Sequence, residues 1–235
     1  MTQDMSRRAF CVAAASTLLA ACGNNAQTES TQEEPVEGEA ETSEPQKEEP
    51  EATSADQASG TTTSKVLVAY YSRADENYAD GGKEWLEIGH TKVMAGYIAE
   101  ALGADQYEIV PVELYPEGYD DCCDVALAEQ HDDARPAIAN ALPDVSAYDL
   151  VFIGCPIWWG EEPMIVRTFL EGVDLSGKVV VPFTTHGGSG LGSVPRNVAS
   201  FAAGADVRDG YAVSGTAVDG AHDEVVDWAK QFALA

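Results

Sequence analysis

One short stretch constrains the fold of this chain more than any other. The apolar run Val151-Phe152-Ile153 leads into Pro156-Ile157-Trp158-Trp159-Gly160. Apolar runs without alternation are typical of strands buried on both faces, as in a parallel sheet covered by helices. Two adjacent tryptophans just past such a strand would lie at the carboxyl edge of the sheet, where open α/β sheets bind ligands. We therefore expect an α/β fold with a ligand site at that edge.

A second apolar strand ends in a similar way. Residues 179–183 run directly into Thr184-Thr185-His186-Gly187-Gly188-Ser189-Gly190, a polar loop rich in glycine. Aromatic walls and a glycine-rich loop on the same rim favour a planar aromatic ligand. A flavin is the ligand that we expect.

The rest of the globular part alternates between strand and helix patterns. Strands are predicted at 65–71, 107–112, 150–154, 178–183 and 206–213. Helices are predicted at 91–102, 119–134 and 194–203, after Pro163 to about residue 172, and around Val225 to Phe232. This alternation predicts a parallel, doubly wound sheet.

Composition divides the chain into three segments. Residues 1–22 are apolar after two arginines, residues 23–64 are acidic and low in complexity, and residues 65–235 are long enough for one well-filled domain. The last segment has ten Lys and Arg against 28 Asp and Glu, a formal charge of −18. A nucleic-acid partner is not expected, because a phosphate backbone requires a basic patch. The acidity either has a functional role or keeps an exported protein soluble.

The first segment resembles an export signal. Arg7 and Arg8 are followed by Phe10 and a short apolar run, as in the twin-arginine signal. Leu19-Ala20-Ala21-Cys22 resembles a bacterial lipobox, in which the cysteine carries the lipid. We expect a protein anchored by Cys22 to the outer face of the cytoplasmic membrane; the alternative is a plain cleaved leader. Residues 23–64 are expected to be a disordered acidic tether, because they have almost no apolar surface to bury.

The cysteines of the globular part do not form a recognisable framework. Cys122, Cys123 and Cys155 are odd in number and two of them are adjacent, so a disulfide framework is not expected. No spacing resembles a metal site. Cys155 is expected to be a small core residue, and a redox role for the adjacent pair is the less favoured alternative.

Two segments at the start of the globular part together suggest a phosphate site. The first strand ends at Ser72-Arg73, and Gly89-His90-Thr91 opens the first predicted helix. Free N–H groups at a helix start bind phosphate readily. Thr91 taken alone is equally a helix N-cap.

With these loops in place, residues 65–235 resemble the flavodoxin family. The Trp-Trp-Gly loop and the Thr-His-Gly-Gly-Ser-Gly loop are the specific part of the resemblance. It implies a flavodoxin-like doubly wound five-stranded parallel sheet of order 2-1-3-4-5, with FMN bound non-covalently at the carboxyl edge. Two departures concern the phosphate site: the segment Ala74 to Ile88 splits the loop after strand one, and His90 stands where the family usually has asparagine.

The family's contacts are carried over position by position. The resemblance implies phosphate contacts from Ser72, Arg73, His90 and Thr91, and ring contacts from Pro156, Ile157, Trp158, Trp159, Gly160, Thr185, His186, Gly187, Gly188 and Ser189. His186 is expected to donate a hydrogen bond to a flavin carbonyl. No residue is assigned a catalytic role, because the ring chemistry belongs to the flavin. Glu161 and Glu162 follow the tryptophan loop, and their charge is expected to lower the flavin's reduction potential.

The expected function is FMN-dependent electron transfer to a redox partner protein or a small electron acceptor. The alternatives are a flavin-dependent quinone or NAD(P)H oxidoreductase and a cofactor-free binding module. No Gly-x-Gly-x-x-Gly motif opens a helix and basic residues are scarce, which favours the carrier over a nicotinamide-dependent enzyme.

Overall fold

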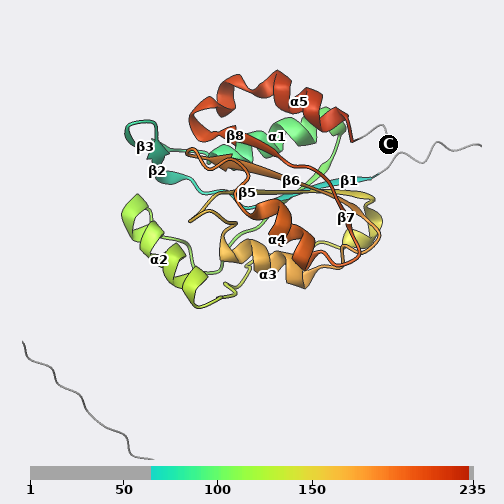
Figure 1. Cartoon of the computed structure of the whole chain (residues 1–235), viewed down its shortest axis with the longest axis horizontal. Coiled ribbons are helices and arrows are strands. Elements are labelled where there is room, and N and C mark those ends of the chain that lie inside the picture. The colour runs from blue at the N-terminus through green and yellow to red at the C-terminus, as the bar shows by residue number, and fades with distance from the viewer. Residues whose placement is uncertain (1–64, 233–235) are drawn as a thin grey trace, which may run out of the picture. The chain divides into compact units, whose positions relative to one another are not determined.

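The computed structural model describes residues 65–232, which form a parallel sheet covered by helices on both faces (Figure 1). The strands of this sheet are β1 (Val66–Tyr70), β4 (Asp105–Glu108), β5 (Leu150–Pro156), β6 (Val179–His186), β7 (Asp206–Val207) and β8 (Tyr211–Ser214). Their order is β4-β1-β5-β6-β7, with β8 also paired to β6, and every pairing is parallel. The predicted order 2-1-3-4-5 is confirmed, with the fifth strand in two pieces.

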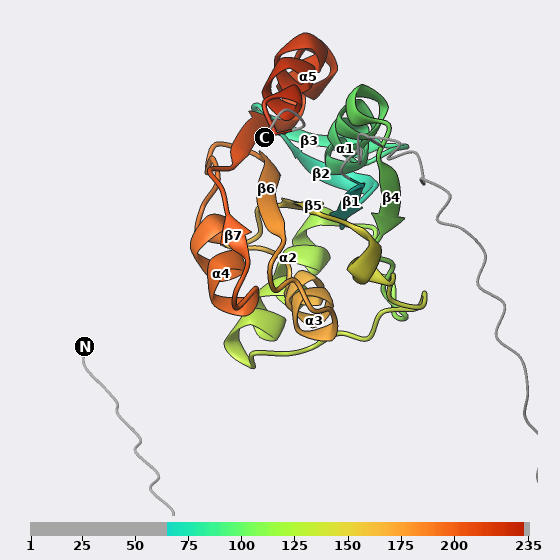
Figure 2. The same ribbon diagram turned by 90° about the vertical axis from the view of Figure 1, so that its right-hand side faces the viewer.

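Five helices cover the sheet. They are α1 (His90–Leu102), α2 (Tyr119–His131), α3 (Met164–Gly172), α4 (Val194–Phe201) and α5 (His222–Lys230), with short 3-10 helices η1 (Val145–Ala147) and η2 (Gly215–Gly220). Helices α1 and α5 lie on one face of the sheet, and α2, α3 and α4 lie on the other (Figures 1 and 2).

The strand side chains alternate between the two layers that these helices create. In β1, Leu67 and Ala69 belong to the core on the α3 and α4 side, whereas Val66, Val68 and Tyr70 belong to the core on the α1 and α5 side. Both faces of the central strands are therefore buried, which is why their sequences are apolar without alternation.

The fifth strand is interrupted, contrary to the continuous strand predicted at 206–213. Val180 pairs with Val207, but Phe183 pairs with Tyr211, so the outer strand contains one extra residue. The interruption lies opposite Pro182, which has no N–H to donate to a neighbouring strand. Gly210 packs closely there, since a Cβ on it would lie 2.7 Å from the Pro182 carbonyl oxygen.

The second strand of the sheet begins and ends earlier than predicted. It pairs with β1 from Asp105 to Glu108 rather than over 107–112. As an edge strand it exposes Asp105 and Gln106, so its start carries no apolar signal.

The segment inserted after β1 forms a β-hairpin. Strands β2 (Asp75–Ala79) and β3 (Gly82–Leu86) pair antiparallel with each other and form a separate sheet. In Figure 1 the hairpin and α2 lie at the same end of the parallel sheet.

The remaining predictions concern residues that the structure does not describe. The export signal with Cys22 and the acidic tether lie within residues 1–64, outside the described residues. Over residues 65–232, none of the helices combines the length and the apolar character that crossing a membrane requires.

Candidate functional site

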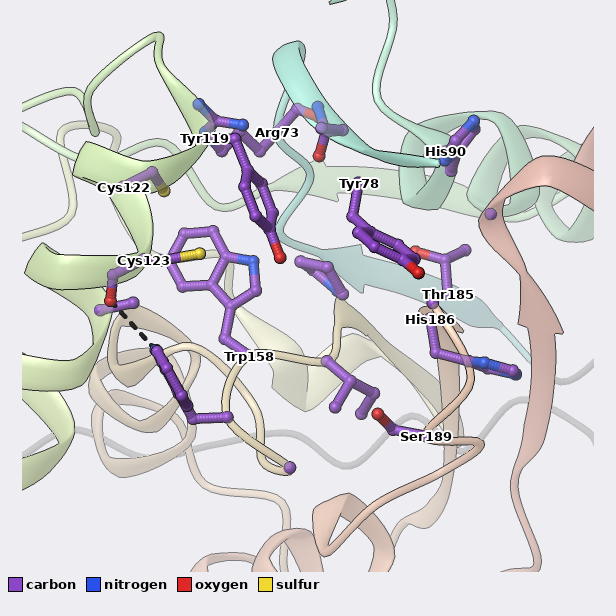
Figure 3. Close-up of a pocket in the computed structure, with 18 of the residues that line it drawn as sticks. Arg73, Tyr78, His90, Tyr119, Cys122, Cys123, Trp158, Thr185, His186 and Ser189 are labelled. Carbon is purple, nitrogen blue, oxygen red and sulfur yellow. Dashed lines mark hydrogen bonds between the residues drawn. The ribbon is translucent and has the colours of Figure 1, made fainter. Parts of the chain in front are cut away.

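A pocket of about 570 Å³ opens at the carboxyl ends of β5 and β6 (Figure 3). Most of the residues predicted to bind the cofactor line it. These are Arg73, His90, Pro156, Ile157, Trp158, Trp159, Gly160, Thr185, His186, Gly187 and Ser189. The structure therefore brings the three predicted loops together around one cavity. Three predicted residues, Ser72, Thr91 and Gly188, do not line it.

The loop after β5 is a tight two-residue turn. Trp158 and Glu161 exchange both backbone hydrogen bonds, 2.9 and 3.0 Å long. The two residues between them have left-handed backbones, with φ of 49° at Trp159 and 85° at Gly160. Positive φ at both central positions suits a hairpin turn, but it is uncommon and strained for a residue as bulky as tryptophan. Such strain is typical of ligand-binding loops.

The two tryptophans have different surroundings. The indole of Trp158 is held edge-on by Tyr71 and Tyr115, at ring-centroid distances of 5.5 and 4.9 Å. The side chain of Trp159 is mostly exposed, and its Nε1 donates a 3.0 Å hydrogen bond to the carbonyl oxygen of Cys123 in α2. Trp158 is thus a fixed part of the pocket wall, whereas Trp159 ties the loop to α2.

The loop after β6 determines the protonation of His186. The backbone N–H of Gly188 donates a 2.9 Å hydrogen bond to Nδ1 of His186. Nδ1 must therefore be unprotonated, and in the neutral ring the proton resides on Nε2. Burial lowers the pKa of His186, which favours this neutral form. His186 can accordingly offer an Nε2–H donor to a ligand.

The expected phosphate residues divide into two pairs. Ser72 and Thr91 make hydrogen bonds within the protein. The Ser72 hydroxyl accepts a 3.0 Å hydrogen bond from the Lys92 N–H, and the Thr91 hydroxyl is hydrogen-bonded to that of Thr185 at 2.7 Å. The Thr91 side chain is therefore not a simple N-cap, and Gly89 is the residue at that position.

Arg73 and His90 do line the pocket, but Arg73 is largely committed to the backbone. Its guanidinium donates to the carbonyl oxygens of Glu76, Pro116 and Glu117. Only its buried Nε lacks a partner among the described residues. The terminal nitrogens therefore connect the hairpin to the segment before α2, and they are not available for a bidentate hydrogen bond to a phosphate.

The start of α1 supplies backbone groups instead. Gly89 is required there, because a Cβ on it would lie 2.3 Å from the Arg73 carbonyl oxygen. Within residues 65–232, the N–H groups of His90 and Thr91 have no hydrogen-bond acceptor. Free N–H groups at a helix start attract an anion.

One wall of the pocket was not predicted from the sequence. Residues of the hairpin and of α2 contribute to it, namely Asn77, Tyr78, Tyr119, Asp120, Cys122, Cys123, Asp124 and Ala126, and Gly215 adds to the rim. Burial, with a contribution from the neighbouring Cys123 thiol, raises the pKa of Tyr119 to about 12, so its phenol stays protonated. The sequence signals this wall only by the length of the segment between Arg73 and Gly89, which is an insertion relative to the family.

Glu161 and Glu162 do not line the pocket. Both carboxylates pair with Arg167, and the Glu162 side chain is fully buried and also accepts from Asn197 at 3.0 Å. The arginine offsets part of their charge. They therefore contribute less negative potential at the pocket than expected from the sequence.

The family model described as flavodoxin matches residues 65–232, which is most of the chain. The chain belongs to the flavodoxin family. Among curated proteins, no match to this flavodoxin was found.

Two solved structures, both from Bacteroides species, agree with this assignment. A flavoprotein from Bacteroides eggerthii DSM 20697 is 32% identical with a TM-score of 0.52, over 69% of this flavodoxin and 98% of that chain. A flavoprotein from Bacteroides uniformis ATCC 8492 is 30% identical with a TM-score of 0.57, over 71% and 98%. A flavoprotein from Lactobacillus acidophilus NCFM, solved in complex with FMN, is 22% identical with a TM-score of 0.47, over 67% and 97%.

Proposed function

We propose that this flavodoxin binds one FMN in the pocket at the carboxyl edge of its sheet and carries electrons between redox partners. The observation that supports this most is the convergence of three strand-end loops on one cavity, with Trp158 on its wall and the start of α1 at its rim. When bound, FMN supplies the electron-transfer chemistry, and the protein supplies orientation and electrostatics.

The residues present fit the parts of FMN. A phosphate suits the free N–H groups of His90 and Thr91, because a helix start favours an anion without requiring lysines. A ring suits the aromatic and glycine-rich walls, and its polar edge suits the hydroxyl of Ser189. The hydrogen bond from Trp159 Nε1 to the Cys123 carbonyl oxygen helps to hold the ring loop in its strained conformation.

The carrier is favoured over an oxidoreductase that binds a nicotinamide dinucleotide. The globular part is strongly acidic, and Asp120 and Asp124 are exposed at the pocket. An anionic dinucleotide would be repelled by such a surface. A small neutral acceptor, or a protein partner with a basic docking face, would not be repelled.

Titration of the purified protein with FMN tests the proposal. We expect saturation at one FMN per chain, a yellow complex with a flavin visible spectrum, and a melting temperature that rises with FMN concentration, because a ligand that binds only the folded state stabilises it. A protein that stays colourless, and whose melting temperature does not change with FMN concentration, would contradict the proposal. FAD serves as the control ligand and is expected to bind much more weakly.

We also propose that lipidation of Cys22 anchors the protein at the outer face of the cytoplasmic membrane. The proposal rests on the motif Leu19-Ala20-Ala21-Cys22, and two acyl chains are enough for stable anchoring. Cys22→Ala is expected to release the protein into the soluble exported fraction, and unchanged membrane retention would contradict the anchor. Arg7→Lys with Arg8→Lys is expected to block export by the twin-arginine route.

A further inference from the structure

The inserted hairpin is fixed to both sides of the pocket. On the α2 side, the Glu76 carboxylate accepts the backbone N–H of Tyr119 at 2.9 Å, and Lys83 pairs with Asp120 at 2.8 Å. On the opposite side, the hydroxyl of Thr216 in η2 donates a 2.9 Å hydrogen bond to Asp80 at the hairpin turn. The hairpin therefore spans the carboxyl edge of the sheet, and contacts with α2 on one side and η2 on the other fix its position.

This anchoring places the ring of Tyr78 against the loop after β6. A Cβ added to Gly187 would lie 2.7 Å from Cδ1 of Tyr78 and 3.1 Å from its Cε1. Only a residue without a side chain allows the ring to lie so close to the backbone. Tyr78 lines the pocket and is nevertheless 48% exposed, so the loop supports one part of the ring and leaves the rest free.

A second aromatic side chain stands across the cavity. In Figure 3 the indole of Trp158 and the ring of Tyr78 lie to either side of the centre of the pocket, and the Tyr119 hydroxyl points between them. Tyr71 and Tyr115 hold Trp158 by edge contacts. Tyr119 lies beside Tyr78, with ring centroids 6.3 Å apart.

We propose that Tyr78 is the second wall of the flavin site, so that the hairpin and the tryptophan loop enclose the isoalloxazine ring from both faces. This inference rests on the proposed binding of FMN and adds a residue of the inserted hairpin that is not among those carried over from the family. With both faces covered, electrons pass at the exposed edge of the ring. A nicotinamide, which must stack on a free face to deliver a hydride, is excluded by the same arrangement.

Tyr78→Leu, Tyr78→Phe and Trp85→Leu, made in the full chain, test the wall directly. Base–aromatic stacking is worth roughly 1–3 kcal/mol, so Tyr78→Leu is expected to weaken FMN binding roughly tenfold to a hundredfold, while Tyr78→Phe keeps the affinity. Trp85→Leu is the matched control, because Trp85 belongs to the same hairpin, is 60% exposed and does not line the pocket. Its FMN affinity is expected to equal that of the parent.

Gly187→Ala adds a test that depends on the contact itself. The backbone of Gly187 is not left-handed, so alanine is strained there only by its contact with Tyr78. Gly187→Ala is therefore expected to weaken FMN binding in the parent and to have a clearly smaller effect in the Tyr78→Leu background. Equal effects in both backgrounds would overturn the inference.

The outcomes separate this inference from the proposed function. A parent chain that binds no FMN contradicts both. A parent chain that binds FMN, together with a Tyr78→Leu variant of the same affinity, contradicts only the wall. Rapid anaerobic bleaching of the bound flavin by NADH would contradict the covered faces, and stable yellow colour under NADH is the expected result.

Discussion

The indole Nε1 of Trp159 donates a 3.0 Å hydrogen bond to the carbonyl oxygen of Cys123, which joins the loop after β5 to α2. The residue that makes this bond also has a left-handed backbone, with φ of 49°. Such a conformation costs about 1–2 kcal/mol for a residue with a side chain. The hydrogen bond offsets part of that cost, since a typical one contributes about 0.5–1.5 kcal/mol.

Trp159→Phe should therefore lower the free energy of unfolding by about 1 kcal/mol, because the ring remains but the donor is lost. Urea denaturation of the FMN-free protein measures the change. Trp85→Phe is the control, since the Trp85 indole makes no hydrogen bond within residues 65–232 and is 60% exposed. Equal stabilities of the two variants would show that the bond to Cys123 contributes nothing.

Trp158→Ala should weaken FMN binding roughly tenfold to a hundredfold, by the usual strength of base–aromatic stacking. Trp159→Ala is measured alongside it and should have the smaller effect on affinity, because Trp159 is more exposed and is directed to α2. Fluorescence quenching of FMN gives both dissociation constants. If neither replacement changes the affinity, the loop after β5 does not bind the flavin.

Acidification should loosen the loop after β6. Burial lowers the pKa of His186 in the folded protein, so the unfolded chain binds the proton more readily. The contribution of His186 to the free energy of unfolding is then fully present above about pH 6.5, the pKa of an unperturbed histidine. It is lost as the pH falls from there toward the lower pKa of the folded state. Protonation at Nδ1 would also break the bond from the Gly188 N–H.

We expect the FMN affinity of the parent to fall between pH 7 and pH 5 more steeply than that of His186→Gln. Titrations of both proteins across this range provide the measurement. Identical pH profiles would rule out His186 as the titrating group.

Cys123 should be the most reactive thiol of the described part of the chain. Burial raises the pKa of Cys122 to about 11 and raises that of the fully buried Cys155 well above its usual range, which leaves both as thiols at pH 8. Cys123 is only partly buried and lines the pocket. Peptide mapping after iodoacetamide treatment should find Cys123 modified first, and FMN should slow that reaction. Labelling of Cys122 ahead of Cys123 would contradict this order.

Arg167→Met should be strongly destabilising. The change leaves the fully buried Glu162 carboxylate without its cation, and breaking a buried pair in this way costs about 3–5 kcal/mol. Adding Glu162→Gln should recover part of the loss, because the uncompensated charge is removed. Thermal or urea denaturation of the single and double variants decides the point; a double variant no more stable than Arg167→Met would contradict it.

The sequence by itself determined the sheet and the loops at its edge. The sequences of β1, β5 and β6 are apolar because these strands are buried on both faces. Their burial can therefore be inferred from consecutive residues of the sequence. The tryptophan and glycine-rich loops follow from where those strands end, and parallel strands bring their carboxyl ends to one edge. Eleven of the fourteen residues carried over from the family line the pocket for this reason.

Only the tertiary structure decided the other wall of the pocket and the use of Arg73. Tyr78 faces the cavity because contacts with α2 and η2, far away in the sequence, hold the hairpin across it. Arg73 does not offer its Nη2 to a phosphate, because that nitrogen donates hydrogen bonds to carbonyl oxygens 43 and 44 residues away in the sequence. Helix α2 buries only Cys122 and Ala126, so its pattern is too weak to reveal the face that lines a pocket. Local periodicity reports which residues are buried, but not which distant segment buries them.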